Sequence, residues 1–86
     1  MIINYHKNFG RKFKKLKLNE QQKAIERINL FIVDSYNPIL SNHSLKGKYQ
    51  GHNSINITGD LRAIFKYISD IKCIFTTIDS HSNLYK

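Results

Sequence analysis

The feature that most constrains the fold is a succession of three strand-like segments in the C-terminal half of the chain. Apolar residues, many of them β-branched or aromatic, mark residues 53–58, 61–68 and 71–78. Gly59-Asp60 and Ser69-Asp70 separate these segments by two residues each. Spacers of this length are typical of tight β-hairpin turns. The pattern therefore predicts a three-stranded antiparallel meander.

The beginning of the chain favours one short strand and one helix. Residues 2–5 form a brief apolar run that indicates a strand. Phe9, Phe13 and Leu16 then recur at positions i, i+4 and i+7, which is the spacing of one face of a helix. We expect this helix over residues 7–16.

A second helix is predicted to begin after Asn19. The Asn19 side chain can cap the first turn, and Gln22 lies three residues later in the register of a capping box. The apolar residues at helical spacing are Ala24, Ile25, Ile28, Phe31 and Ile32. The helix should end near Asp34-Ser35, because the turn-forming Asn37-Pro38 follows and a residue before proline is biased away from helical geometry.

Two helices followed by a hairpin-linked sheet indicate an α+β fold. We expect both helices to pack on one face of the small antiparallel sheet, with Cys73 and the five phenylalanines in the core and the other face uncovered. Residues 37–53 lack sustained periodicity, which predicts a long connecting loop, and loops of this length are often functional. The 86 residues contain no linker, so residues 1–86 are expected to form one domain.

The charge balance is strongly basic. The formal net charge of +8 is expected of a protein that binds a polyanion such as nucleic acid. A coding bias towards Lys, Ile and Asn would produce a similar excess without selection for binding. Six cations lie close together at Lys7, Arg11, Lys12, Lys14, Lys15 and Lys17. This stripe is either a solvated helix face or a surface that docks phosphates or an acidic partner.

The sequence disfavours membrane-spanning, secreted and metal-binding proteins. No apolar run approaches the roughly 20 residues needed to span a bilayer. The first residues lack the apolar region of a secretory signal, and the single cysteine, Cys73, cannot form an internal disulfide. We therefore expect a cytoplasmic protein. The four histidines and Cys73 lack the short spacing of a zinc site, and no phosphate-loop or dinucleotide motif is present, so no metal or cofactor is expected.

Several ionisable and aromatic side chains fall in the loop, at strand junctions and at the C-terminus. They are His43, His52, Asp60, Arg62, His81 and Tyr85. These positions can converge on the uncovered face of a meander, because they lie at or beyond the ends of its strands. Imidazole suits proton transfer since its ordinary pKa of about 6.5 lies near cellular pH. Taken singly, a loop histidine is more often a solvated or hydrogen-bonded surface residue.

Three motifs in order along the chain carry a family resemblance. They are His43-Ser44-Leu45-Lys46-Gly47, Asn56-Ile57-Thr58-Gly59-Asp60 and His81-Ser82-Asn83-Leu84-Tyr85. The sequence thereby resembles the YafQ-like branch of the RelE/ParE superfamily of bacterial toxins. Those toxins show a His-Pro-Leu-x-Gly loop, a strand leading to an Asp near a Trp, and a terminal His-Ser-x-Leu-Phe/Tyr. The resemblance extends over nearly the whole chain.

The resemblance implies two N-terminal helices on an antiparallel sheet, with an N-terminal strand at the edge of the sheet. For function, it implies the toxin of a type II toxin–antitoxin system: a ribosome-dependent endoribonuclease that cleaves mRNA and inhibits translation without a metal. Its partners would be a cognate antitoxin, the ribosome and mRNA. Such a reaction needs a base for the ribose 2′-OH, an acid for the 5′-oxygen and a cation for the phosphorane.

The resemblance also assigns site residues by position. The candidate catalytic residues are the loop residue His43, Asp60 after the strand, His81 near the C-terminus and the terminal aromatic Tyr85. We expect His81 to matter most for proton transfer, with Leu84 anchoring its segment. The candidate RNA-binding residues are Asn56, Arg62, Lys46, Lys48, Arg11, Lys12, Lys14, Lys15 and Lys17.

Three positions depart from the family pattern. Asn56 stands where many relatives have a strand histidine, Leu61 where they commonly have Trp, and Thr77 near their Arg. Asparagine can hydrogen-bond a phosphate but cannot exchange protons near pH 7. His52 or Arg62 could compensate. Two other functions therefore stay open: a ParE-like toxin that inhibits gyrase, and a degenerate member that only binds its antitoxin or a nucleic acid.

Overall fold

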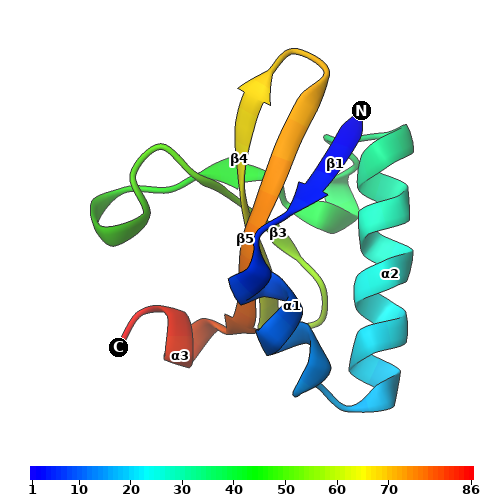
Figure 1. The fold of residues 1–86 in the computed structure, drawn as a ribbon, viewed down its shortest axis with the longest axis vertical. Helices are drawn as coiled ribbons and strands as arrows, with labels where there is room; N and C mark the ends of the chain where they lie inside the picture. The colour runs from blue at the N-terminus through cyan, green and yellow to red at the C-terminus, as the bar shows by residue number, and fades with distance from the viewer.

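The computed structural model describes all of residues 1–86 and shows a mixed sheet flanked by helices (Figure 1). In chain order, the elements are β1 (Ile2–Tyr5), α1 (Lys7–Lys14), α2 (Leu18–Val33), the 3₁₀ turn η1 (Pro38–Leu40), β2 (His43–Ser44), the 3₁₀ turn η2 (Gly47–Tyr49), β3 (Asn53–Asn56), β4 (Leu61–Ser69), β5 (Lys72–Ser80) and α3 (His81–Leu84). The fold is α+β, as the sequence predicts.

The sheet contains five strands in the order β1-β5-β4-β3-β2. Strands β3, β4 and β5 form the predicted antiparallel meander. Strand β1 is confirmed and lies at one edge, where it pairs in parallel with β5. The first and last strands of the chain are therefore neighbours in the sheet, and α1, which follows β1, packs against β5.

Both predicted helices are present, but α2 begins earlier than expected. Its N-cap is Lys17 rather than Asn19, and the Glu20 carboxylate accepts a hydrogen bond of 2.9 Å from the Lys17 amide. Glu20 takes this role because its carboxylate also suits the positive end of the helix dipole. The predicted end is confirmed, since Asp34 is the C-cap. None of the helices is long and apolar enough to cross a membrane.

The segment 37–53 is more structured than the predicted plain loop. It contains η1 and η2 and adds the two-residue strand β2 to the free edge of β3, with His43 opposite Ser54. A strand of two residues is too short to produce a periodic sequence pattern, which explains why it was not predicted.

The core lies between the sheet and the two long helices. Phe31 of α2 is fully buried, and its ring centroid lies 4.8 Å from that of Phe65 and 5.6 Å from that of Phe75. Cys73 and four of the five phenylalanines are buried as expected, while Phe13 is partly buried against the core. The predicted apolar face of α2 is wrong at two positions, because Ile25 and Ile32 are exposed.

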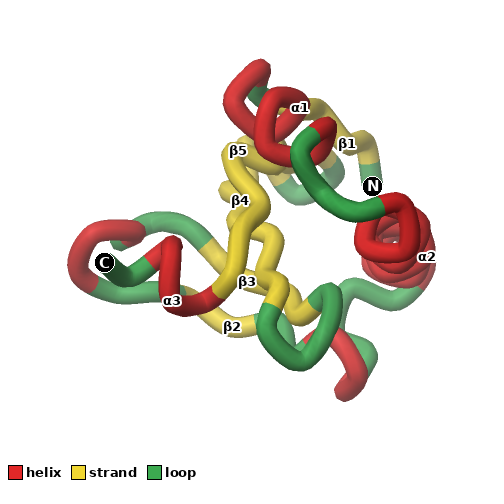
Figure 2. The backbone as a smooth tube through the Cα atoms, turned by 90° about the horizontal axis from the view of Figure 1, so that it is seen from below, coloured by secondary structure: helices red, strands yellow, loops and turns green.

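The opposite face of the sheet is not simply uncovered, which corrects a further expectation. Ile64 and Thr77 are cross-strand partners that are both buried on this face. Leu84 of α3 is buried as well. Figure 2 shows α3 on the side of the sheet away from α2. The short C-terminal helix thus covers part of this face and leaves a hollow beside it.

Candidate active-site cleft

The hollow beside α3 is a polar cleft of about 650 Å³. Thr76, Thr77 and Asp79 of β5 contribute to it from the sheet. The N-terminal wall comes from the start of α1, and the opposite wall comes from the η2 segment and α3. No residue of α2 contributes. The cleft is therefore built from three segments that are far apart in the sequence, residues 6–12, 48–52 and 76–84.

Positive charge dominates the walls of this cleft. Arg11 and Lys12 project from α1, and Lys48 projects from the η2 segment. The only acidic residue that lines the cleft is Asp79, and its Oδ2 atom lies 3.0 Å from Lys12 Nζ. Arg11 and Lys48 therefore remain as cations without a carboxylate partner, which is the arrangement that binds a phosphate.

Asp79 ties α1, β5 and α3 together. Besides Lys12, its carboxylate accepts hydrogen bonds from the Ser80 amide at 2.8 Å and from Asn83 Nδ2 at 3.0 Å. Burial alone would raise the pKa of Asp79, but these hydrogen bonds and the Lys12 charge outweigh burial and hold its pKa below the usual value. Asp79 is therefore a fixed anion that positions the two walls relative to one another.

Two histidines also line the cleft, one on each wall. His6 is the N-cap of α1, and its Nδ1 atom accepts a hydrogen bond of 3.0 Å from the Asn8 amide. His52 precedes β3, and its Nδ1 atom lies 3.4 Å from the Gln50 carbonyl oxygen. Sequence reasoning missed His6 and Asp79. The position of His6 between a strand and a helix was the signal that could have indicated a capping role.

An aromatic row extends from His52 along the rim towards the C-terminus. The ring centroids of His52 and Tyr49 lie 6.3 Å apart, those of Tyr49 and Tyr85 lie 5.8 Å apart, and those of Tyr85 and His81 lie 4.9 Å apart. Rings at the edge of a cationic cleft can stack on the bases of a single-stranded nucleic acid. The row joins a cleft histidine to His81.

His81 is held firmly by its backbone although its side chain is exposed. It is the first residue of α3, which is capped by Ser80 Oγ. The His81 amide donates a hydrogen bond of 2.9 Å to the Asp60 carbonyl oxygen. Leu84 is buried, which confirms the predicted apolar anchor. The backbone therefore holds His81 next to the cleft residues Asn83 and Leu84, and its imidazole is open to solvent and to a substrate.

Several solved structures with the same architecture are bacterial toxins. YafQ of E. coli superposes with a TM-score of 0.82 at 18% identity, and 98% of this chain and 97% of that chain are covered. A copper-bound mutant toxin from Helicobacter pylori superposes with a TM-score of 0.78 at 28% identity, over 98% of each chain. This chain therefore has the fold of these toxins.

The same fold is found in the E. coli DinJ–YafQ toxin–antitoxin complex, where YafQ matches with a TM-score of 0.79 at 19% identity and 98% of this chain and 96% of that chain are covered. No protein-family model and no curated protein sequence matches this chain.

The fold brings some of the predicted catalytic residues together and leaves one apart. Asp60, on the β3–β4 turn, contacts the His81 segment through its carbonyl oxygen, and Tyr85 packs against the His81 ring. His43 lies on the edge strand β2 outside the cleft, and its Nδ1 atom is 2.7 Å from the Ser41 carbonyl oxygen. His52, from the same region of the chain, lines the cleft instead.

The predicted RNA-binding residues also separate into groups. Lys14, Lys15 and Lys17 are exposed but lie beyond the cleft, as does Lys46. The Arg62 guanidinium donates to the carbonyl oxygens of residues 58, 59 and 61 at 2.9 to 3.2 Å, so it braces the β3–β4 turn. Asn56 lines a different, smaller pocket beside α2.

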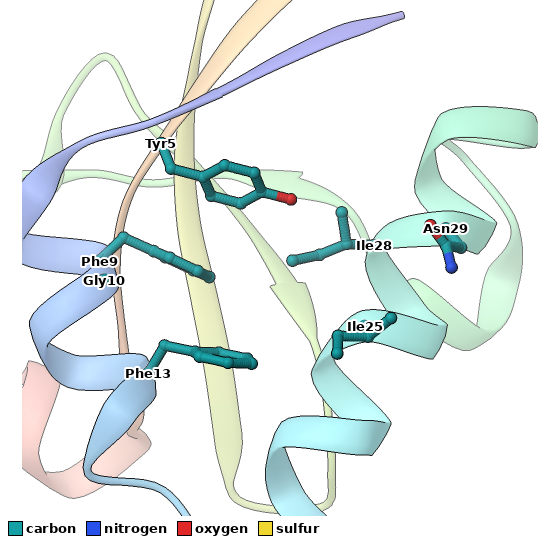
Figure 3. Close-up of a pocket in the computed structure, with 7 residues that line it drawn as sticks. All are labelled: Tyr5, Phe9, Gly10, Phe13, Ile25, Ile28 and Asn29. Carbon is teal, nitrogen blue, oxygen red and sulfur yellow. The ribbon is translucent and has the colours of Figure 1, made fainter.

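Other parts of the molecule offer less chemistry. Cys73 is fully buried, and burial raises the pKa of its thiol to about 11, so it is not a nucleophile. No group of three or more His, Cys, Asp or Glu side chains is placed to hold a metal ion. A second groove of about 360 Å³ between α1 and α2 is lined mainly by Tyr5, Phe9, Phe13, Ile25 and Ile28 (Figure 3). It carries no ionisable pair.

Proposed function

We propose that this protein is the toxin of a bacterial toxin–antitoxin pair and that it cleaves mRNA on the ribosome. The observation that carries the proposal is the cationic cleft with histidines on both walls and His81 at its rim. It lies in a fold shared with solved toxins. A cleft of this composition suits cleavage of a phosphodiester by proton transfer and charge stabilisation.

The proposed reaction is attack of a ribose 2′-OH on the adjacent phosphate. A base takes the 2′-hydroxyl proton, an acid gives a proton to the leaving 5′-oxygen, and cations stabilise the pentacoordinate phosphorane. We assign proton transfer to His81, with His52 as the second imidazole on the same aromatic row. Arg11 and Lys48 would hold the phosphate, and Tyr49 and Tyr85 would stack on the flanking bases.

The test is a cleavage assay with purified protein, ribosomes and a defined mRNA, read by primer extension. We expect discrete cleavage with the wild-type protein only when ribosomes are present. Intact mRNA together with gyrase trapped on broken DNA would instead identify a gyrase-inhibiting toxin. Intact mRNA and normal growth of cells that contain the folded protein would leave only a binding role.

The binding-only role is the second candidate, and two observations favour it. His43 lies outside the cleft, and the Arg62 guanidinium is engaged by three backbone carbonyl oxygens. His43 is therefore not placed on a phosphate held in the cleft, and the Arg62 guanidinium is already engaged by the β3–β4 turn. The assay above separates the two candidates, because the binding-only role requires no cleavage product.

The proposed partner is an acidic antitoxin. YafQ was solved in complex with DinJ, and the net charge of +8 on this chain favours a protein of opposite charge. Disordered acidic segments can cover a large cationic surface and order on binding. The product of a small acidic reading frame adjacent to this one should co-purify with the tagged chain. A neighbour that is expressed but does not co-purify would contradict the partner assignment.

A further inference from the structure

Arg27 of α2 carries an unpaired buried donor. Its Nε atom is shielded from solvent and has no hydrogen-bond partner, and it is the one buried side-chain nitrogen or oxygen in the molecule with this property. Leaving a buried donor of a charged group without an acceptor is costly. Such a group finds its acceptor in an ordered water or in a molecule that binds beside it.

A pocket of about 440 Å³ lies beside Arg27, between α2 and the β3–β4 turn. Lys23, one helical turn away, supplies a second cation, and Asn56 and Thr58 supply polar groups. None of the residues that line the pocket is acidic. Lys23 Nζ lies 3.6 Å from the Glu26 carboxylate, but Glu26 is well exposed, and a pair of this kind holds Lys23 only weakly. The pocket therefore presents two cations and no carboxylate of its own.

We propose that this Arg27 pocket binds the carboxylate of an Asp or Glu side chain from a protein partner. The planar guanidinium suits the two oxygens of a carboxylate. Ile39 and Ile57 complete the lining, so an acidic side chain could pack its methylene groups there. The net charge of +8 attracts an acidic chain to this surface.

An RNA phosphate is the less favoured ligand because of where the pocket lies. The pocket is lined by α2 and by the turn after β3, and it shares no residue with the cationic cleft. Figure 2 places α2 across the sheet from α3, which borders that cleft. An RNA strand bound in the cleft would therefore not pass the Arg27 pocket. The identity of the partner as an antitoxin rests on the proposed function, but the carboxylate site itself does not.

The test follows the side-chain Nε–H signals of Arg11, Arg27 and Arg62 by NMR in the intact protein. Sodium acetate is titrated at constant ionic strength, with sodium chloride as the reference and inorganic phosphate as a second probe. We expect acetate to shift the Arg27 signal saturably and to leave the Arg62 signal in place. Tighter binding of phosphate than of acetate at Arg27, or no saturable shift beyond that given by chloride, would overturn the proposal.

Matched variants locate the acetate site. Arg27→Lys keeps the charge but lacks the guanidinium fork, so acetate should bind about tenfold more weakly, as read from the amides of Thr58 and Gly59. Lys23→Gln, at a partly exposed position, should also weaken acetate binding. It is the test variant if Arg27→Lys does not fold. Lys66→Gln, which removes one charge at an exposed position of β4 outside both pockets, is the control and should leave acetate affinity unchanged. Because the titration needs no ribosome, it can succeed even if the protein cleaves no mRNA.

Discussion

The two faces of the sheet serve different purposes in this molecule. The face covered by α2 is apolar and closely packed, with the rings of Phe31, Phe65 and Phe75 in mutual contact. The other face carries one small buried cluster and an open cationic cleft. Because successive side chains of a strand point to opposite faces, a single strand such as β5 serves both. Substitutions on one face can therefore change stability, and substitutions on the other face can change chemistry, separately in this small domain.

The largest expected effect is on the cleft side, at His81. If His81 transfers a proton, His81→Ala should slow ribosome-dependent cleavage by about 10²–10⁴-fold. Unfolding should change little, because the His81 side chain is exposed and its helix is held by Leu84. Ser82→Ala, at an exposed neighbouring position, is the control. A folded His81→Ala protein that cleaves at the wild-type rate would contradict the mechanism, whereas a loss of stability at an unchanged rate would show a structural role.

On the face of the sheet that α2 covers, the largest expected effect is a loss of stability on substitution of Phe31. Phe31→Ala should lower the free energy of unfolding by roughly 3–5 kcal/mol, since it removes a fully buried ring. Urea unfolding followed by circular dichroism measures this change. Val33→Ala, at a position that is 85% exposed, should change stability by less than about 0.5 kcal/mol. Equal effects of the two substitutions would show that the core is not centred on Phe31.

A comparison of two histidines sharpens the boundary of the cleft. His52 lines the cleft, whereas His43 lies outside it on β2. His52→Ala should therefore reduce cleavage by at least about tenfold more than His43→Ala does. The rates are measured on the same ribosome and mRNA preparation, with folding checked by circular dichroism. The reverse order would mean that the substrate reaches beyond the cleft to the sheet edge.

A smaller effect is expected where the two walls of the cleft meet, at Asp79. Asp79→Asn should lower the free energy of unfolding by about 1 kcal/mol at neutral pH, because its partner Lys12 is partly exposed. The pKa of Asp79 is lowered in the folded state, so its contribution is present above the unfolded pKa of about 3.9 and disappears as pH falls through the folded value. Urea unfolding of the two proteins should therefore converge in acid. A difference that is independent of pH would exclude this carboxylate as the cause.

The smallest predicted effect is on the salt dependence of RNA binding, when cations inside the cleft and cations outside it are removed. Removal of one cation that binds a phosphate should reduce the salt slope of single-stranded RNA binding by about 0.7. Arg11→Gln with Lys48→Gln should reduce the slope by about two such steps, while Lys15→Gln with Lys17→Gln should reduce it less, because these lysines lie beyond the cleft. Fluorescence anisotropy at several salt concentrations measures both slopes. Equal reductions would extend the binding surface along the whole basic stripe.

The sequence alone determined the local elements of this protein. Helical spacing placed α1, the Asn37-Pro38 turn marked the end of α2, and two-residue turns defined the meander of β3, β4 and β5. These features depend on contacts between near neighbours in the chain, so the pattern of residues is sufficient to predict them. Family motifs likewise located His81 and its anchor Leu84. The strand β2 and the exact start of α2 were missed because their signals span only two or three residues.

Which of these elements meet depends on the packing of the folded chain. The parallel pairing of β1 with β5 brings α1 beside the C-terminal strand, and Lys12 thereby reaches Asp79, 67 residues away. The same pairing places His6 in the cleft with His52. Such contacts depend on which apolar faces pack together, because that packing sets the position of the polar side chains on the same helix. No local pattern encodes that choice, because the packing of the whole domain selects it.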